Sequence, residues 1–226
     1  MIDITLGDAR LEPLLQQISE VAGHIHSYGW AEANAGNISI NVSSLFTPEE
    51  LDFKQLYLVS RAGSRYRQTA LKPKENLLLV LSDKDQDIYQ PSDAKPTSEW
   101  ISHKCLQMQR PRFSVILHTH PAEIIALRQI PKLQDTKLLN RLLPEILPEF
   151  SLYLPEGIAM APLCPPGSQE LCDASSSALK DEKALIWSGH GLLSFSDDLD
   201  FALDYMEIIV KACRVLFLYP ELLKLF

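Results

Sequence analysis

The sequence predicts an α/β fold, with a single domain over residues 1–226 in which a central mixed, mostly antiparallel β-sheet is covered by helices on both faces. Three observations support this prediction. A chain of 226 residues has the length of one domain of ordinary size. Its 46% hydrophobic and 22% charged residues give the balance of a soluble globular protein. Segments with strand and helix periodicity also follow one another without a strict β-α-β alternation.

Helices are predicted where apolar residues recur at three- and four-residue spacing. The first covers residues 9–28 and ends beside Gly29, a residue type that can adopt the left-handed conformation of a helix C-cap. Further helices are expected at 96–110, 122–130, 168–183 and 197–219. The helix at 96–110 begins with a Thr-Ser pair after a proline, and its apolar side is expected to carry Trp100, Ile101, Cys105 and Met108.

Strands are predicted where apolar residues alternate with polar ones or form short runs bounded by turn residues. They are expected at 38–42, 56–59, 75–83, 113–121 and 184–195. The last of these is interrupted by the glycines at 189 and 191, and residues 83–87 form a polar turn. The segment 151–168 is expected to hold two short strands and a proline-rich turn.

The charge of the chain excludes some classes of function. Its 29 acidic and 21 basic residues give a net charge of −8, which argues against non-specific nucleic-acid binding because that needs a basic face. A small phosphorylated substrate remains compatible with this charge.

The four cysteines form no CxxC pair and are expected to be reduced thiols. No signal-peptide pattern and no run long enough for a bilayer is visible, so a cytoplasmic location without a membrane partner is expected.

Three histidines are candidate metal ligands. His118 and His120 stand two residues apart at the end of a predicted strand, so their side chains leave the same face and can converge on one ion. Two histidines that hydrogen-bond in a polar cleft without a metal are the alternative for this spacing. His190 stands between two glycines, which let the backbone bring an imidazole close to a ligand. A glycine-rich turn with an incidental histidine is the alternative.

Glu99 is the candidate acid–base residue. It lies in the first turn of a predicted helix, where a carboxylate can serve the helix dipole, face a metal or accept a proton. His103 is four residues further along the same helical face and is expected to support the site indirectly or to lie at the surface. His24 and His26, among core positions of the first helix, are expected to be structural.

Three short segments of small, hydrogen-bonding residues are candidate phosphate-binding loops. Each can present amides or hydroxyls to a phosphate, although each by itself is also an ordinary turn. The candidate residues are Asn34, Asn37, Gly63, Ser64, Thr97 and Ser98.

The order of these motifs resembles one known family. The segments NAGN (34–37), AGS (62–64), PTSEW (96–100), HTHP (118–121) and GHG (189–191) follow one another as in the class II aldolase family of sugar-phosphate lyases and epimerases. GWAEANAGNISI also resembles the family's segment around its phosphate-binding asparagines, and LYLPEGIAM resembles a later strand. The resemblance covers nearly the whole chain.

The resemblance implies roles for the candidate residues. The three histidines would hold Zn²⁺ and Glu99 would be the carboxylate beside it, while the loop residues would bind the phosphate of dihydroxyacetone phosphate. The family's enzymes are homotetramers with the cleft between subunits. A glutamate of the neighbouring chain completes the acid–base chemistry in some of them, and Glu149 stands at the matching place.

The reaction implied is cleavage of a ketose 1-phosphate to dihydroxyacetone phosphate and a small aldehyde such as lactaldehyde. Breaking this carbon–carbon bond leaves an enediolate, whose charge a zinc ion can stabilise as a Lewis acid. Glu99 would exchange a proton at the nucleophilic carbon, and Glu149 would take the proton from the hydroxyl on the cleaved carbon.

Two alternatives stay open from the sequence. A pentulose-phosphate 4-epimerase would break and re-form the same bond, but the family's epimerases have SSD where this chain has Ser98-Glu99, which favours the aldolase. A non-catalytic assembly module like the adducin head domain would be marked by loss of the metal ligands, and all three histidines are present here.

Overall fold

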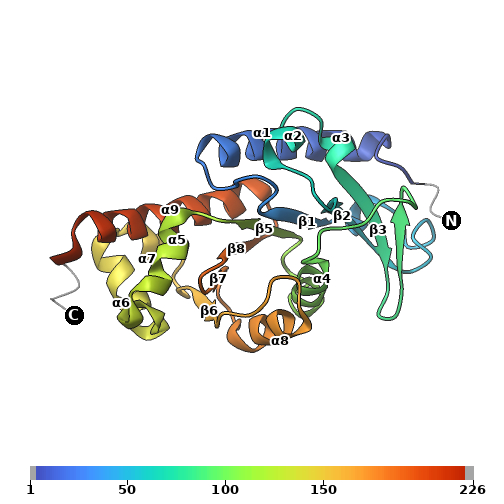
Figure 1. Cartoon of the computed structure of the whole chain (residues 1–226). Coiled ribbons are helices and arrows are strands. Elements are labelled where there is room, and N and C mark those ends of the chain that lie inside the picture. The colour runs from blue at the N-terminus through green and yellow to red at the C-terminus, as the bar shows by residue number, and fades with distance from the viewer. Residues whose placement is uncertain (1–3, 222–226) are drawn as a thin grey trace.

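One eight-stranded sheet organises the chain, in a computed structural model that describes residues 4–221 (Figure 1). Its strand order is β4-β3-β2-β1-β5-β8-β7-β6, and every neighbouring pair is antiparallel except β6 and β7. The strands are β1 (Asn37–Asn41), β2 (Gln55–Ser60), β3 (Leu77–Ser82), β4 (Asp87–Gln90), β5 (Val115–Thr119), β6 (Ala159–Ala161), β7 (Ala184–Trp187) and β8 (Gly191–Ser196). The predicted fold class is confirmed.

Helices lie on both faces of the sheet, with α1 and α9 above it and α4 and α8 below it in Figure 1. The α-helices are α1 (Glu12–Ser27), α2 (Tyr66–Thr69), α3 (Pro73–Asn76), α4 (Trp100–Gln109), α5 (Ala122–Ala126), α6 (Thr136–Ile146), α7 (Glu149–Tyr153), α8 (Gln169–Ala178) and α9 (Leu199–Leu218). Short 3-10 helices are η1 (Ala9–Leu11), η2 (Ser43–Leu45), η3 (Leu127–Gln129) and η4 (Pro131–Gln134). Between residues 4 and 221, no helix is at once long and apolar enough to cross a membrane.

Alternate residues of the central strands pack against the two helical layers. In β5, Ile116 belongs to the cluster formed with Leu106 of α4 and Leu171 of α8. The next residue, Leu117, belongs instead to the larger cluster that includes Met206 of α9. Because successive side chains of a strand leave opposite faces, a central strand covered on both sides is apolar throughout. This explains why Val115, Ile116 and Leu117 form a continuous apolar run.

Side chains at the helix starts explain why several helices begin where the sequence predicts. Asp198 accepts hydrogen bonds from the amides of Asp200 and Phe201 at the start of α9, and Ser168 accepts one from Leu171 at the start of α8. Both satisfy amides that a helix leaves without internal partners. At the C-terminal end of α1, Gly29 has a φ of +70°, which is the left-handed conformation predicted for this helix cap.

Several segments differ from the prediction, since no helix was predicted at α2, α3 or α6. β4 was not predicted, because this edge strand is only partly buried and its sequence lacks a clear apolar alternation. The first of the two strands expected within 151–168 is wrong, since residues 151–153 belong to α7 and only β6 is a strand there. Phe150 packs into the core from α7, which a helical turn allows and the short sequence pattern could not show.

The apolar side predicted for α4 is only partly correct. Trp100 is buried, but Ile101 and Met108 are 39% and 46% exposed. The helix instead buries Ser102 and His103, both fully inaccessible, so His103 is not a surface residue. A partner explains the burial of His103, whose Nδ1 is 2.8 Å from the Ser39 hydroxyl oxygen, whereas the Ser102 hydroxyl has no partner among the described residues.

Candidate active site

The strand directions bring several chain segments to one edge of the sheet. Since β1 runs antiparallel to both β2 and β5, the start of β1 lies beside the ends of β2 and β5, with Asn37 opposite His118. β8 runs antiparallel to β5, so it begins at the same edge, with Thr119 opposite Leu192. His190 precedes β8 by one residue. This strand register therefore places His190 beside His118 and His120.

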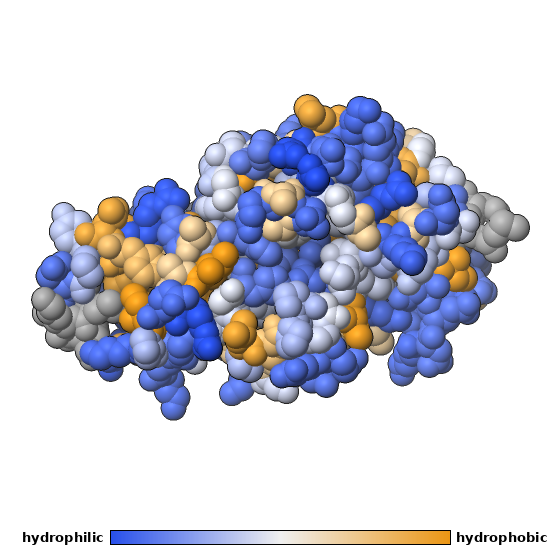
Figure 2. Space-filling model, viewed as in Figure 1, coloured by the Kyte–Doolittle hydropathy of each residue, from blue (hydrophilic) through white to orange (hydrophobic). Residues whose placement is uncertain are grey.

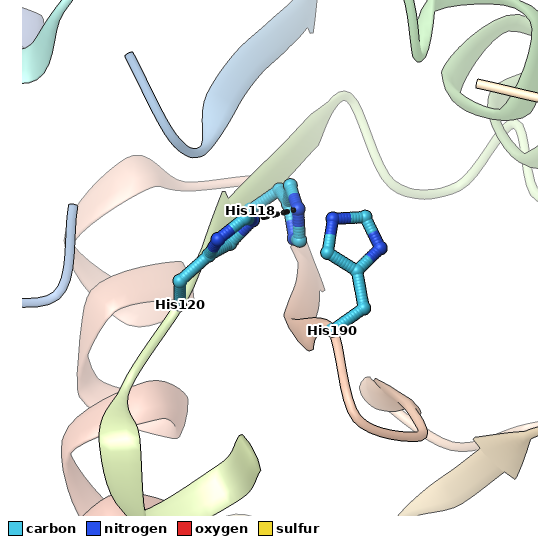
Figure 3. Close-up of side chains that lie close together, drawn as sticks. All are labelled: His118, His120 and His190. Carbon is cyan, nitrogen blue, oxygen red and sulfur yellow. Dashed lines mark hydrogen bonds between the residues drawn. The ribbon is translucent and has the colours of Figure 1, made fainter. Parts of the chain in front are cut away.

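The three histidines face one another at this edge (Figure 3). One ligand nitrogen from each of them lies within 4.8 Å of the others, and Nε2 of His118 is 3.0 Å from Nε2 of His120. Nδ1 of His118 donates a hydrogen bond of 3.0 Å to the carbonyl oxygen of Leu192. That bond fixes the tautomer, so the lone pair of His118 Nε2 points toward the other two rings.

The surroundings keep these imidazoles neutral. Burial lowers the pKa of His118 well below its usual value, and the neighbouring imidazoles lower it further. Burial, with a smaller effect of His120, lowers the pKa of His190 to about 4. Burial also lowers the pKa of His120, against the opposing effect of Glu32. Neutral imidazoles are the form that binds a transition metal, so the donor set fits a metal ion with an open coordination position.

Glu99 lies against this cluster, directly before α4. Its Oε2 is 3.4 Å from Nε2 of His118 and its Oε1 is 3.3 Å from Nε2 of His190. Only 5% of the residue is exposed. Burial raises the pKa of the Glu99 carboxyl, and a hydrogen bond from Asn37 opposes that rise. A carboxyl in such surroundings holds a proton more readily than an exposed one.

Glycine is required beside the histidines for steric reasons. A Cβ at Gly191 would lie 2.8 Å from Cε1 of His118 and 3.0 Å from Cδ2 of His120. A Cβ at Gly36 would lie 2.6 Å from the carbonyl oxygen of His118, and Gly36 has a φ of +73°. The absence of a side chain at Gly36 and Gly191 therefore lets the backbone at both positions lie close to β5 and its histidines, as the sequence suggested for the glycines around His190.

A cavity of about 480 Å³ opens over the cluster. On the face seen in Figure 2, hydrophilic surface occupies the recess between β1 and α8. All six candidate phosphate-binding residues contribute to the cavity wall, together with Glu99, His120 and His190, while the fully buried His118 lies beneath it. The lining residues are Glu32, Ala33, Asn34, Ala35, Gly36, Asn37, Arg61, Ala62, Gly63, Ser64, Thr97, Ser98, Glu99, His120, Pro166 and His190.

Other singled-out residues lie elsewhere. Glu149 is exposed at the start of α7 and does not line this cavity within one chain. His24 and His26 are exposed on α1 and are not core residues, because they fall on the solvent side of its helical turn. His103 is buried below the site, with Nδ1 2.8 Å from the hydroxyl oxygen of Ser39.

Sequence reasoning missed three residues near the site. The Tyr66 hydroxyl donates to the carbonyl oxygens of Asn37 and His118, at 2.8 and 3.0 Å, and so ties the two strand ends together. Nothing in the local sequence points to this tyrosine. Glu32 and Arg61 line the cavity, and the position of Arg61 directly before the AGS turn was a usable signal.

Three imidazoles and a buried carboxylate at the edge of such a sheet define a metal-dependent enzyme. The family described as Class II Aldolase and Adducin N-terminal domain matches residues 16–217, and the chain belongs to this family. Within it the chain is a class II aldolase, a carbon–carbon lyase, and the alternative of an assembly module without activity is set aside.

Named relatives agree with this placement. A rhamnulose-1-phosphate aldolase of Listeria welshimeri is 28% identical over 90% of this chain and 82% of its own length. Another from Bacteroides thetaiotaomicron is 27% identical, over 89% of this chain and 84% of its own. The crystal structure of a sugar-phosphate aldolase from Thermotoga maritima superposes with a TM-score of 0.81 at 27% identity, covering 94% of this chain and 97% of that one.

Proposed function

We propose that this protein is a zinc-dependent aldolase that cleaves a ketose 1-phosphate, rhamnulose 1-phosphate or a close analogue. The products are dihydroxyacetone phosphate and a small aldehyde such as lactaldehyde. The observation that carries the proposal is the shared cavity, in which the histidine cluster and Glu99 stand beside loops rich in small hydrogen-bonding residues. The names of the rhamnulose-1-phosphate aldolase relatives support this substrate.

The chain's own residues divide the work between binding and proton transfer. His118, His120 and His190 hold the zinc ion, which when bound supplies a Lewis acid beside the oxygens of the substrate. Amides and hydroxyls of Asn34, Asn37, Gly63, Ser64, Thr97 and Ser98 hold the phosphate. Fixing both ends of the substrate turns binding energy into orientation of the bond that breaks.

Glu99 donates the proton to the nucleophilic carbon in the direction of cleavage. When the bond between C3 and C4 of the ketose breaks, its electron pair passes to the C2–C3 fragment, and C3 then needs a proton to give dihydroxyacetone phosphate. A carboxyl whose pKa is raised by burial holds such a proton more readily than an exposed one. A second group must remove the C4 hydroxyl proton as the aldehyde forms.

Glu149 of a neighbouring chain supplies that second group in a homotetramer. Within one chain Glu149 is exposed, and the same helix α7 carries Leu152, which is 77% exposed. Phe201 at the start of α9 is 52% exposed, and Leu152 and Phe201 line one surface depression. Apolar residues gathered on a surface in this way are typical of protein contacts, which supports an interface beside Glu149.

The test is a coupled assay for dihydroxyacetone phosphate release from a panel of 1-phosphorylated ketoses. Zinc-loaded protein should release it from at least one of them, EDTA should abolish the release, and added zinc should restore it. No release from any ketose would reject the aldolase proposal. Interconversion of pentulose phosphates without release would identify the epimerase instead.

A further inference from the structure

Arg61 supplies the only Lys or Arg side chain among the described residues that line the cavity. Two carboxylates, Glu32 and Glu99, line the same cavity, and the chain as a whole carries a net charge of −8. A phosphate monoester has a charge of about −1.5 to −2 at pH 7. Hydroxyls and amides can hydrogen-bond such a group, but they add no net positive charge to balance it.

Arg61 is positioned by its backbone next to the other candidate phosphate-binding residues. Its carbonyl oxygen accepts a hydrogen bond from the amide of Ser64 at 3.1 Å, which closes a turn around Gly63 at a φ of +76°. Arg61 also forms an isolated β-bridge with Pro96. This bridge joins the turn after β2 to the segment that contains Thr97, so both loops face the cavity together.

The Arg61 charge has no counter-charge in the described part of the chain. One guanidinium nitrogen, Nη1, donates to the backbone carbonyl oxygen of Glu75 at 3.3 Å, and no carboxylate of residues 4–221 pairs with Arg61. Arg10 and Arg214, by contrast, each pair with carboxylates. Arg61 is half-buried and lines the cavity, and a guanidinium with several N–H donors and no paired carboxylate is suited to bind an anion from solution.

The sheet separates this charge from the reacting end of the site. Arg61 follows β2, which is two strands away from β5, and adjacent strands are roughly 5 Å apart. The histidine cluster follows β5 and precedes β8. Arg61 and the histidines therefore lie two strands apart along one cavity, which suits an elongated ligand with an anionic group at the Arg61 end.

We propose that Arg61 binds the phosphate of the substrate through its guanidinium group and makes the site select phosphorylated over unphosphorylated ketoses. The inference rests on the proposed aldolase function for the identity of the substrate. The anion site itself depends only on the cavity and its charges. Arg61 is a specificity-determining residue, since it contacts the phosphate rather than the carbons that react.

The test compares wild type with Arg61→Gln, Arg61→Lys and the control Arg67→Gln. Arg67 is exposed on α2 outside the cavity, so its replacement makes the same charge change without touching the site. Calorimetry measures the Kd of inorganic phosphate on zinc-loaded and on EDTA-treated protein, which separates binding by the metal from binding by Arg61. Steady-state kinetics measure kcat and KM for a ketose 1-phosphate and for the same ketose without phosphate.

Arg61→Gln should raise the phosphate Kd and the KM of the phosphorylated ketose at least about tenfold, the size of one charge-assisted contact. The kcat/KM for the unphosphorylated ketose should not change. The phosphate Kd and the KM of Arg61→Lys should lie between those of wild type and Arg61→Gln. Both values for Arg67→Gln should match wild type.

Two results would overturn the role of Arg61: phosphate affinity and KM in Arg61→Gln no worse than in Arg67→Gln, or equal losses toward both ketoses. The aldolase reaction would stand in either case. If wild type cleaves no ketose but its phosphate affinity still depends on Arg61, the reaction is wrong and the anion site stands.

Discussion

The amide nitrogen of Asn37 donates a hydrogen bond of 2.6 Å to Oε2 of Glu99, joining residues 62 positions apart. The bond stabilises the charged carboxylate and opposes the rise in pKa that burial causes. Asn37 Oδ1 is buried without a partner among the described residues. Asn37 therefore orients the proposed acid–base group in addition to its proposed contact with phosphate.

Asn37→Ala should lower kcat by roughly 10- to 100-fold, the value of a lost hydrogen bond to a charged group. Its zinc content should stay close to wild type, because Asn37 is not a proposed ligand. The matched variant Asn34→Ala removes an exposed amide from the same loop and should raise KM more than it lowers kcat. An Asn37→Ala enzyme with unchanged kcat would show that the hydrogen bond has no catalytic role.

Glu99→Gln should lower kcat by at least about 100-fold while fold and zinc content persist. Glutamine is close to the same size and shape, so altered packing cannot account for such a loss. Glu49→Gln, at an exposed position remote from the cavity, is the control for loss of one negative charge. Wild-type turnover in Glu99→Gln would remove this residue from the mechanism.

Glu149→Ala should impair turnover and spare zinc content, if the residue acts in the cleft of an adjacent chain. Mixing Glu149→Ala chains with Glu99→Gln chains should then restore part of the activity. In mixed tetramers some clefts combine an intact Glu99 with an intact Glu149, whereas neither variant alone has such a cleft. Should subunit exchange be demonstrated and activity remain absent, Glu149 does not act across an interface.

Gly191→Ala should disrupt zinc binding without a change in any ligand. The added methyl group would collide first with the backbone carbonyl oxygen of Thr119, and it would lie 2.8 Å from the ring of His118 and 3.0 Å from that of His120. The backbone between β5 and β8 and the two rings must therefore shift. We expect zinc affinity to fall at least about tenfold and stability to fall by about 1–3 kcal/mol, as in overpacked cores. Gly7→Ala, at an exposed glycine whose Cβ would meet nothing closer than 3.5 Å, should be neutral in both measurements.

His103 should make the protein less stable in mild acid. Burial lowers its pKa in the folded state to about 3, against 6.5 as the reference value. Below pH 6.5 the unfolded chain binds a proton that the folded chain does not, so this contribution is complete above pH 6.5 and is lost as pH falls toward 3. Between pH 7 and 5 the loss should be about 2 kcal/mol.

Chemical denaturation of wild type and His103→Gln at both pH values measures this contribution. We expect the variant to be less stable than wild type at pH 7, because it loses the bond between His103 and Ser39, but to lose less stability on acidification. An identical decrease in the two proteins would mean that His103 does not titrate in this way.

Local pattern predicted several parts of the fold in which burial has a regular period, although α6, which buries Leu139, Leu142 and Leu143 at helical spacing, was not predicted. α1 and α9 have apolar stripes at helical spacing, and β3 is a short run of buried residues, so each was predictable without its neighbours. β4 and α7 were not, because one is a partly buried edge strand and the other is a helix of a single turn. The buried face of α4 was also missed, since it is set by the polar partners of His103.

The sequence by itself determined that His118 and His120 share one face of a strand, because side chains two residues apart in a strand always do. It also determined that glycine flanks His190. Only the tertiary structure decided that His190 reaches the other two histidines, since this depends on the pairing of β5 with β8. The hydrogen bond from Asn37 to Glu99 and the place of Arg61 depend on pairing in the same way. A short sequence pattern cannot encode such contacts, because they join segments far apart in the chain that meet only when the whole sheet has formed.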